Sequence, residues 1–254
     1  MYKFNEVRKA KIKSPVLIEG LPGIGNVGKI AVDFIIDNIK AEKIYEISSY
    51  NFPHAVFVNE KNLVELPTIE IFHKRLKNQD YLLLAGDIQP IDEASCYEFC
   101  DILLDLFEKY NGREIITIGG IGMQQVPKNP KVYSTANNKK IIQKYMSKNM
   151  TNQIYGVVGP IVGISGLLVG LSGTRKIPSI ALLAETYGHP AYLGIKGARE
   201  VLKILNDKLN LNLNLEKLDD EIDNIEKEIT TKTKQFEFLQ KAKRPKTGGV
   251  DYIG

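Results

Sequence analysis

Apolar runs and segments with a helical repeat alternate along most of this chain. The runs are typical of buried strands, and they lie at residues 16–18, 43–48, 54–58, 68–72, 81–87, 114–118, 154–158 and 179–186. Segments with helical spacing begin near Ile30, Asp92, Pro160 and Ala198. Because strands that alternate with helices build layered sheets, the pattern predicts an α/β domain. Residues 1–15 are polar and predict only a lead-in to the first strand.

A glycine-rich segment, residues 18–29 (IEGLPGIGNVGK), joins the first predicted strand to the first helix. Its glycines fit the spacing of a P-loop, but Ile30 stands where that loop needs a Mg²⁺-binding Ser or Thr. They also fit the dinucleotide fingerprint, with Glu46 near the ribose-binding position, but the fingerprint's first glycine does not directly follow the strand. We therefore expect the turn from Gly23 to Gly28 to be structural. A nucleotide- or nucleoside-binding enzyme that uses this turn is the alternative.

The remaining sequence contains no clear catalytic pattern. Ser165 does not sit in a nucleophile elbow, because no residue separates it from the following glycine. Cys96 and Cys100 share one face of a predicted helix, which is more typical of packed, reduced thiols than of a metal site. The three histidines are scattered. We therefore predict no catalytic residues, no metal and no cofactor.

Composition and charge argue against nucleic acid and membrane as partners. The chain has 254 residues, 43% of them hydrophobic, and a formal net charge of +4. Its compact basic cluster, residues 241–246, lies in a predicted tail, so nucleic-acid binding is not expected. Residues 154–173 carry no charge, but they are too weakly apolar for a membrane span, and their recurring glycines predict a helix face that a neighbour approaches closely. Reduced thiols and a polar N-terminus predict a cytoplasmic protein.

The character of the sequence changes near residue 211. Apolar residues then alternate in steps of four and three between Glu, Asp, Lys and Asn, at Leu211, Leu215, Leu218, Ile222, Ile225 and Ile229. This a/d spacing predicts a coiled-coil-like helix that packs on a partner or lies back on its own domain. The predicted organisation is an α/β domain at residues 1–210, this helix at 211–241 and a flexible tail at 242–254.

A set of motifs in fixed order resembles the PAC2 family of proteasome assembly chaperones. They are GLPGIGNVG at 20–28, GDIQP at 86–90, GGIG at 119–122, PKVY at 130–133, GISGLL at 163–168 and LAET at 183–186. The resemblance covers residues 16–218. It implies a Rossmann-like layered sheet, similar to nucleoside phosphorylases, in a homo-oligomer. It also implies a non-catalytic protein that docks on the α subunits of the proteasome core particle.

The same resemblance draws attention to the end of the sequence. Relatives that dock on the α subunits use a tail that ends in a hydrophobic residue, a tyrosine and one further residue, and its carboxylate pairs with a lysine between subunits. Here the tail elements are Tyr252, Ile253 and Gly254, with Tyr252 one position early and Asp251 in the hydrophobic position. An aromatic anchor beside a carboxylate is a known recognition mode. The tail is thus expected to dock directly or to act with a second chaperone subunit.

Three kinds of function follow from these observations. The first is a proteasome assembly chaperone or proteasome-binding scaffold, which the ordered motifs favour. The second is the nucleotide- or nucleoside-binding enzyme described above. The third is an oligomeric adaptor that recruits a partner through the heptad-patterned helix, with Leu215, Leu218, Ile222, Ile225 and Ile229 in the contact.

Overall fold

The computed structural model describes residues 2–58, 61–90, 92–148, 150–151, 153, 159–216 and 218–220. Contacts divide the chain into two units, Met1–Asn214 and Leu215–Gly254, and the elements named below belong to the first. The strands are β1 (Tyr2–Glu6), β2 (Val16–Glu19), β3 (Glu42–Ser49), β4 (Phe57–Val58), β5 (Val64–Glu65), β6 (Ile69–Leu76), β7 (Gln79–Gly86), β8 (Glu114–Met123), β9 (Val132–Ala136), β10 (Met150–Thr151) and β11 (Ser179–Tyr187). The helices are η1 (Ile24–Asn26), α1 (Val27–Ile39), α2 (Glu93–Lys109), α3 (Lys139–Tyr145), α4 (Ile164–Thr174) and α5 (Ile195–Leu209).

The main sheet has nine strands in the order β1-β3-β6-β7-β2-β8-β11-β9-β10. Its centre, β7-β2-β8-β11, is parallel. On one side β6, β3 and β1 continue the sheet in antiparallel pairs, and on the other β9 is antiparallel to β11. The prediction of a mixed α/β domain is therefore confirmed.

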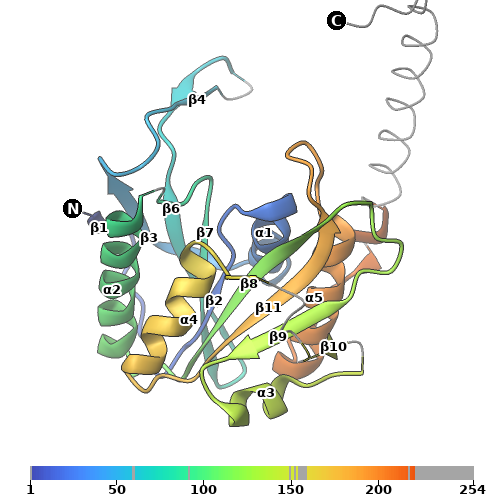
Figure 1. The fold of residues 1–254 in the computed structure, drawn as a ribbon. Coiled ribbons are helices and arrows are strands. Elements are labelled where there is room, and N and C mark those ends of the chain that lie inside the picture. The colour runs from blue at the N-terminus through green and yellow to red at the C-terminus, as the bar shows by residue number, and fades with distance from the viewer. Residues whose placement is uncertain are drawn as a thin grey trace, which may run out of the picture. The chain divides into compact units, whose positions relative to one another are not determined.

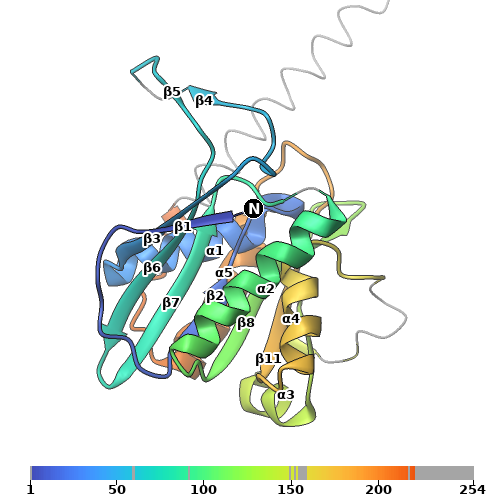
Figure 2. The same cartoon turned by 90° about the vertical axis from the view of Figure 1, so that its left-hand side faces the viewer.

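Helices cover both faces of this sheet. Helices α1 and α5 lie together on one face, and α2 and α4 lie together on the other (Figures 1 and 2). The face of the sheet toward α2 and α4 is buried. Its core contains the strand residues Leu17, Leu84 and Ile115 and the helix residues Phe99 and Leu168. The alternate strand positions, among them Ile18, Leu83 and Ile116, are also buried, as the two-residue period of a doubly covered sheet requires.

The expectation that residues 1–15 only lead into the first strand is wrong for residues 2–6. Residues 2–6 form β1, which pairs with β3. Tyr2 is buried, its hydroxyl donates a 3.0 Å hydrogen bond to the carbonyl of Ser95, and its ring meets Phe99 edge-on. Tyr2 and Phe4 alternate with polar residues, which is the pattern of a strand with one buried face. Contact of Tyr2 with helix α2, which is far away in the sequence, stabilises this strand.

The middle of the chain also differs from the predicted secondary structure. We expected a strand at 114–118 that ends in a glycine turn, but β8 runs on through Gly119, Gly120 and Gly122. The sequence pattern also missed β9, α3 and β10. Helix α3 is short and polar, and it is anchored by Tyr145, whose hydroxyl donates a 2.8 Å hydrogen bond to Glu114. Residues 154–158, expected to form a strand, lie outside the described residues.

The expected glycine face of α4 is confirmed in part. An added Cβ would lie 2.2 Å from the carbonyl oxygen of Ile161 at Gly166 and 3.2 Å from the Cβ of Asn137 at Gly173, whereas at Gly170 it would meet no atom within 4 Å. The heptad helix does not begin at Leu211, because residues 211–214 have no regular secondary structure. Among the described residues, no helix has the length and apolar character needed to cross a membrane.

Candidate functional site

The parallel strands of the sheet centre all end at one edge, which is where open α/β sheets hold their functional groups. This carboxyl edge carries Glu19 at the end of β2, Gly86 at the end of β7 and Thr186 near the end of β11. The glycine-rich turn between β2 and α1 lies across it. The geometry of this edge decides between the nucleotide-binding and structural interpretations of the turn.

The turn is packed tightly against its neighbours. Gly25 has a φ of +62°, and a Cβ added there would lie 2.5 Å from the Thr186 Oγ1. A Cβ on Gly28 would lie 2.4 Å from the carbonyl oxygen of Ile118 in β8. The Gly25 carbonyl accepts a 2.7 Å hydrogen bond from the N–H of Gly194, just before α5. The turn therefore uses its glycines to contact β8, β11 and the start of α5, which supports the structural interpretation.

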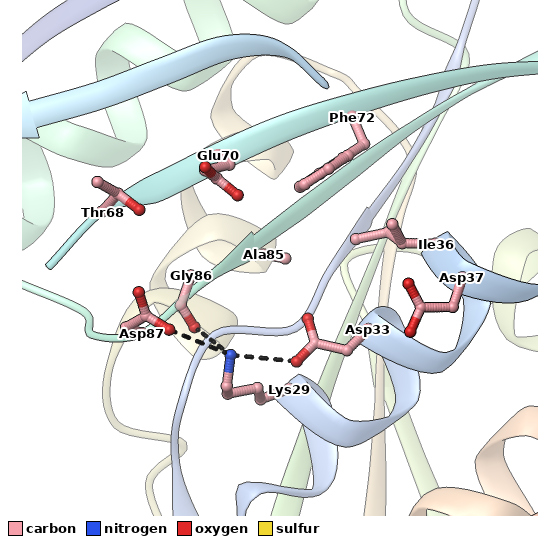
Figure 3. Close-up of a pocket in the computed structure, with 10 residues that line it drawn as sticks. All are labelled: Lys29, Asp33, Ile36, Asp37, Thr68, Glu70, Phe72, Ala85, Gly86 and Asp87. Atoms are coloured by element: carbon pink, nitrogen blue, oxygen red, sulfur yellow. Dashed lines mark hydrogen bonds and ion pairs between the residues drawn. The ribbon is translucent and has the colours of Figure 1, made fainter. Parts of the chain in front are cut away.

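Lys29 follows the last glycine, at the position of a P-loop lysine, but its ammonium group is already engaged. Its Nζ lies 3.1 Å from Asp33 and 3.5 Å from Asp87, and it donates a 3.1 Å hydrogen bond to the carbonyl of Gly86 (Figure 3). Two carboxylates thus compensate its charge. A phosphate group would have to displace them, so this lysine is poorly suited to nucleotide binding.

The same residues line a pocket of about 290 Å³ beside β6 and β7 (Figure 3). Besides Lys29 it contains the carboxylates of Asp33, Asp37, Asp87 and Glu70. Burial raises the pKa of Asp33, and the negative charges of Asp37 and Asp87 add to the rise against the opposing effect of Lys29. The pocket is therefore acidic, which disfavours an anionic ligand.

Gln89 connects two segments that the sequence singled out separately. Its Nε2 donates a 2.7 Å hydrogen bond to the carbonyl of Pro22 in the glycine turn. Its Oε1 accepts a 3.2 Å hydrogen bond from the N–H of Ile164, the first residue of α4. The preceding Gly163 has a φ of +90°, and an added Cβ would lie 2.7 Å from the same Gln89 oxygen. One amide side chain thereby fixes the turn against the start of α4.

Glu185 makes the corresponding connection between β9 and β11. Its Oε2 accepts a 3.0 Å hydrogen bond from the N–H of Lys131, and its Oε1 accepts a 3.1 Å hydrogen bond from the Tyr133 hydroxyl. The PKVY and LAET motifs therefore meet in space. Together with Gln89 and Lys29, Glu185 shows that these sequence motifs form one contact network along the carboxyl edge.

Glu19 is a buried carboxylate at the same edge. It has no exposed surface, and its Oε1 accepts a 2.9 Å hydrogen bond from the N–H of Leu21. Its Oε2 has no hydrogen-bond partner of acceptable geometry among the described residues. Burial raises the pKa of Glu19 to about 7, although the Leu21 N–H favours the charged form.

Glu114, at the opposite edge of the sheet, shows how a positively charged partner changes the pKa of a buried carboxylate. Burial also opposes its ionisation, but the hydrogen bonds from Lys144 and Tyr145 outweigh burial and lower its pKa. Glu19 forms no ion pair within the described ranges that would offset burial in this way, so its pKa stays raised, at about 7.

Apolar side chains are exposed at the same edge. Ile24 in the turn, Met123 at the end of β8, and Val126 and Leu193 in the adjoining loops are each 38% to 51% exposed. The Tyr187 ring stacks on His189 nearby. Exposed apolar and aromatic side chains of this kind are typical of protein contact surfaces.

Most predicted site residues lie outside the described part of the chain. This applies to Tyr252, Ile253 and Gly254 of the tail and to Ile222, Ile225 and Ile229 of the helix. Leu215 and Leu218 are described, and the N–H of Leu218 donates a 3.1 Å hydrogen bond to the Leu215 carbonyl. The roles of all these residues stay predictions. Sequence reasoning did not assign roles to Gln89, Glu185 or Glu19, whose partners are far away in the chain.

Comparison with known proteins identifies the family. A sequence model described as the PAC2 family matches residues 17–232, and the chain therefore belongs to the PAC2 family. The crystal structure of Pyrococcus furiosus PbaB, described as an archaeal proteasome activator, is 29% identical, with a TM-score of 0.84 over 92% of this chain and 98% of that chain. PbaA from the same organism, described as an archaeal homolog of proteasome-assembly chaperone, is 23% identical, with a TM-score of 0.76 over 94% and 95%. The uncharacterized protein MJ1210 of Methanocaldococcus jannaschii is 28% identical over 96% of this chain and 93% of its own length.

The contact between Gly25 and Thr186 gives a first prediction. Gly25→Ala places a side chain on a left-handed backbone and against Thr186, so we expect it to lower the free energy of unfolding by about 1–3 kcal/mol. Gly23→Ala is the matched control, because its backbone is extended and no atom lies within 4 Å of the added Cβ. Denaturant titration measures both. Equal stability of the two variants would contradict the packing described here.

The burial of Glu19 gives a second prediction. The folded-state pKa is about 7 against an ordinary value of 4.5, so this group's contribution to stability is complete below pH 4.5 and is lost as the pH rises through 7. Glu19→Gln keeps an acceptor for Leu21 and has no charge. At pH 8 it should be more stable than the parent by about 3 kcal/mol, and at pH 4 the two should be similar. Unfolding titrations at both values test this, and a difference independent of pH would contradict it.

Proposed function

We propose that this PAC2-family chain is a non-catalytic, cytoplasmic protein that binds the proteasome core particle and assists its assembly. The observation that carries the proposal is the likeness to PbaB, at 29% identity and a TM-score of 0.84 over almost all of both chains. The likeness to PbaA adds only a shared fold, since that identity is 23%. The PAC2 match over residues 17–232 supports the same class of function.

The carboxyl edge agrees with this proposal. Its glycine turn is occupied by contacts with β8, β11 and the start of α5, and Lys29 is neutralised by Asp33 and Asp87. These features favour a protein-binding role over the alternative of a nucleotide- or nucleoside-binding enzyme. The exposed apolar side chains around Ile24 and Met123 add a surface suited to a protein partner.

Activation of an assembled proteasome is a second candidate, and the description of PbaB favours it. Both roles require docking on the core particle. An assembly chaperone acts on particles that are still forming, whereas an activator acts on assembled particles. Adding the chain to isolated α and β subunits should raise the yield of assembled particles if it is an assembly chaperone. Adding it to mature particles should raise peptide hydrolysis if it is an activator.

The contacts that we propose come from the sequence. Tyr252, Ile253 and Gly254 would dock on the α subunits, with Tyr252 as the aromatic anchor. The heptad residues Leu215, Leu218, Ile222, Ile225 and Ile229 would hold a homo-oligomer or a second chaperone subunit. The Rossmann-like relationship of the sheet also remains part of this proposal, since the parallel centre β7-β2-β8-β11 is compatible with it.

Titration of assembled α-rings with the chain tests the docking proposal. Tyr252→Ala should weaken binding by about 2 kcal/mol, roughly 30-fold, because it removes the anchor. A chain shortened after Lys241 should lose at least as much. Tyr97→Ala is the matched control, since Tyr97 is a half-exposed tyrosine of the folded domain. Equal binding by all these chains would show that the tail is not the docking element, and no binding by the parent would refute the function.

A further inference from the structure

Only a short stretch of chain separates the buried carboxylate of Glu19 from solvent. The residues that follow it become steadily more open, because Leu21 is 3% exposed, Pro22 is half-buried and Gly23 is exposed. The Leu21 N–H donates its hydrogen bond directly to the Glu19 Oε1, so this stretch lies against the carboxylate. We call residues 21–23 the cover segment.

The second oxygen of Glu19 lies on the same sheet face as another buried polar side chain. Thr117 in β8 is the register partner of Glu19, and residues paired in this way point to the same face. The Glu19 Oε2 and the Thr117 Oγ1 are both buried, and neither has a hydrogen-bond partner of acceptable geometry among the described residues. Both atoms would therefore gain a hydrogen bond if water reached them.

The elements packed around Glu19 offer hydrogen-bond donors, but within the described ranges they offer no positive charge. Helix α2 presents the thiol of Cys100, and burial and then the charge of Glu19 raise the pKa of this thiol. Helix α4 presents the Ser165 hydroxyl, which acts with the Leu21 N–H to lower the pKa of Glu19. The neighbour on β7 is the apolar Leu84. An ionised Glu19 would thus be buried without a cation.

The side chains of Glu19 and Gln89 hold the cover segment in place. Glu19 accepts the bond from the Leu21 N–H, and Gln89 donates to the Pro22 carbonyl. Gly23, at the end of the segment, has an extended backbone, and an added Cβ there would meet no atom within 4 Å. The segment therefore has room to move at Gly23.

We propose that ionisation of Glu19 opens the cover segment and lets water reach the carboxylate, so that this part of the carboxyl edge responds to pH. Opening hydrates a charge that is otherwise buried without a partner cation, and it also hydrates the Thr117 hydroxyl. The segment leads directly into Ile24, which belongs to the exposed apolar side chains of this edge, so opening moves part of that surface. The opening is a property of the chain alone and does not depend on the proposed proteasome function.

The direction of the pH dependence follows from the two pKa values of Glu19. Its pKa is about 7 in the closed form, and it returns toward the ordinary value of 4.5 once water reaches the carboxylate. The advantage of the closed form is therefore complete below pH 4.5 and is lost as the pH rises through 7. By this linkage the open population should rise roughly 70-fold between about pH 5 and pH 8.

Hydrogen exchange of the Leu21 amide, followed by NMR, measures the opening, because this N–H is bonded to Glu19 in the closed form. The intrinsic exchange rate also rises with pH, so each rate is divided by the rate in Glu19→Gln at the same pH. This ratio should rise roughly 70-fold from about pH 5 to pH 8. Glu185→Gln is the matched control, since it makes the same substitution at the same edge but on β11. It should keep the pH dependence of the parent.

The Cys100 thiol supplies a second readout. It is fully buried and faces Glu19 from α2, so in a Cys96→Ser background a thiol reagent should reach it through the open form. Its labelling rate, divided by the rate in Glu19→Gln in the same background, should also rise with pH, since the division removes the change in thiolate fraction.

Three results would overturn the proposal. The first is a Leu21 ratio that stays constant with pH, and the second is a Glu185→Gln control that loses the pH dependence as Glu19→Gln does. The third needs no variant: equal opening free energies for Leu21 and for Ile116, in the centre of β8, would show that the pH acts on unfolding of the whole domain.

Discussion

The arrangement of the carboxyl edge depends on one constraint, the close approach of the glycine turn to β8 and β11. Gly25 must accept a left-handed backbone beside Thr186, and Gly28 must lie against the carbonyl of Ile118. β8 contributes from its own side, because a Cβ on Gly120 would lie 2.2 Å from the carbonyl oxygen of Ile24. Any side chain at these positions would push the turn away from the sheet.

The position of the turn determines what surrounds it. Pro22 reaches the Gln89 amide, and Lys29 reaches Gly86 and the carboxylates of Asp33 and Asp87. Glu19 is then enclosed without a charged partner among the described residues. The glycine pattern that imitates a nucleotide-binding loop is thus explained by packing, and the lysine that follows it by an ion-pair network.

The secondary structure was predictable where a segment's own pattern determines it. The buried runs at β2, β7 and β11 and the N-cap of α2, where Asp92 accepts a hydrogen bond from the N–H of Ser95, are local signals. β1 and α3 were missed because their stability comes from distant contacts, Tyr2 with Phe99 and Tyr145 with Glu114. The glycines of β8 indicated a turn because the close approach of Ile24 is invisible in the sequence.

The candidate site was predictable only in part, for the same reason. The structural role of the turn from Gly23 to Gly28 followed from its misfit to both nucleotide motifs. The partners of Gln89 and Glu185 did not, since each joins segments more than fifty residues apart. The strand expected at residues 54–58 was interpreted as buried, but only Phe57 and Val58 form a strand there and both are exposed, because an apolar run does not itself show whether a core covers it.

The central claim is that contacts within the chain occupy the space around the glycine turn, and that the molecule acts by binding proteins. Scanning calorimetry of the native protein with millimolar ATP, NAD or nucleosides tests it most directly, because a ligand at a hundred times its Kd stabilises the folded state by about 2.7 kcal/mol. The account predicts the same melting temperature with and without each compound. A rise of several degrees that disappears in Lys29→Ala would contradict it.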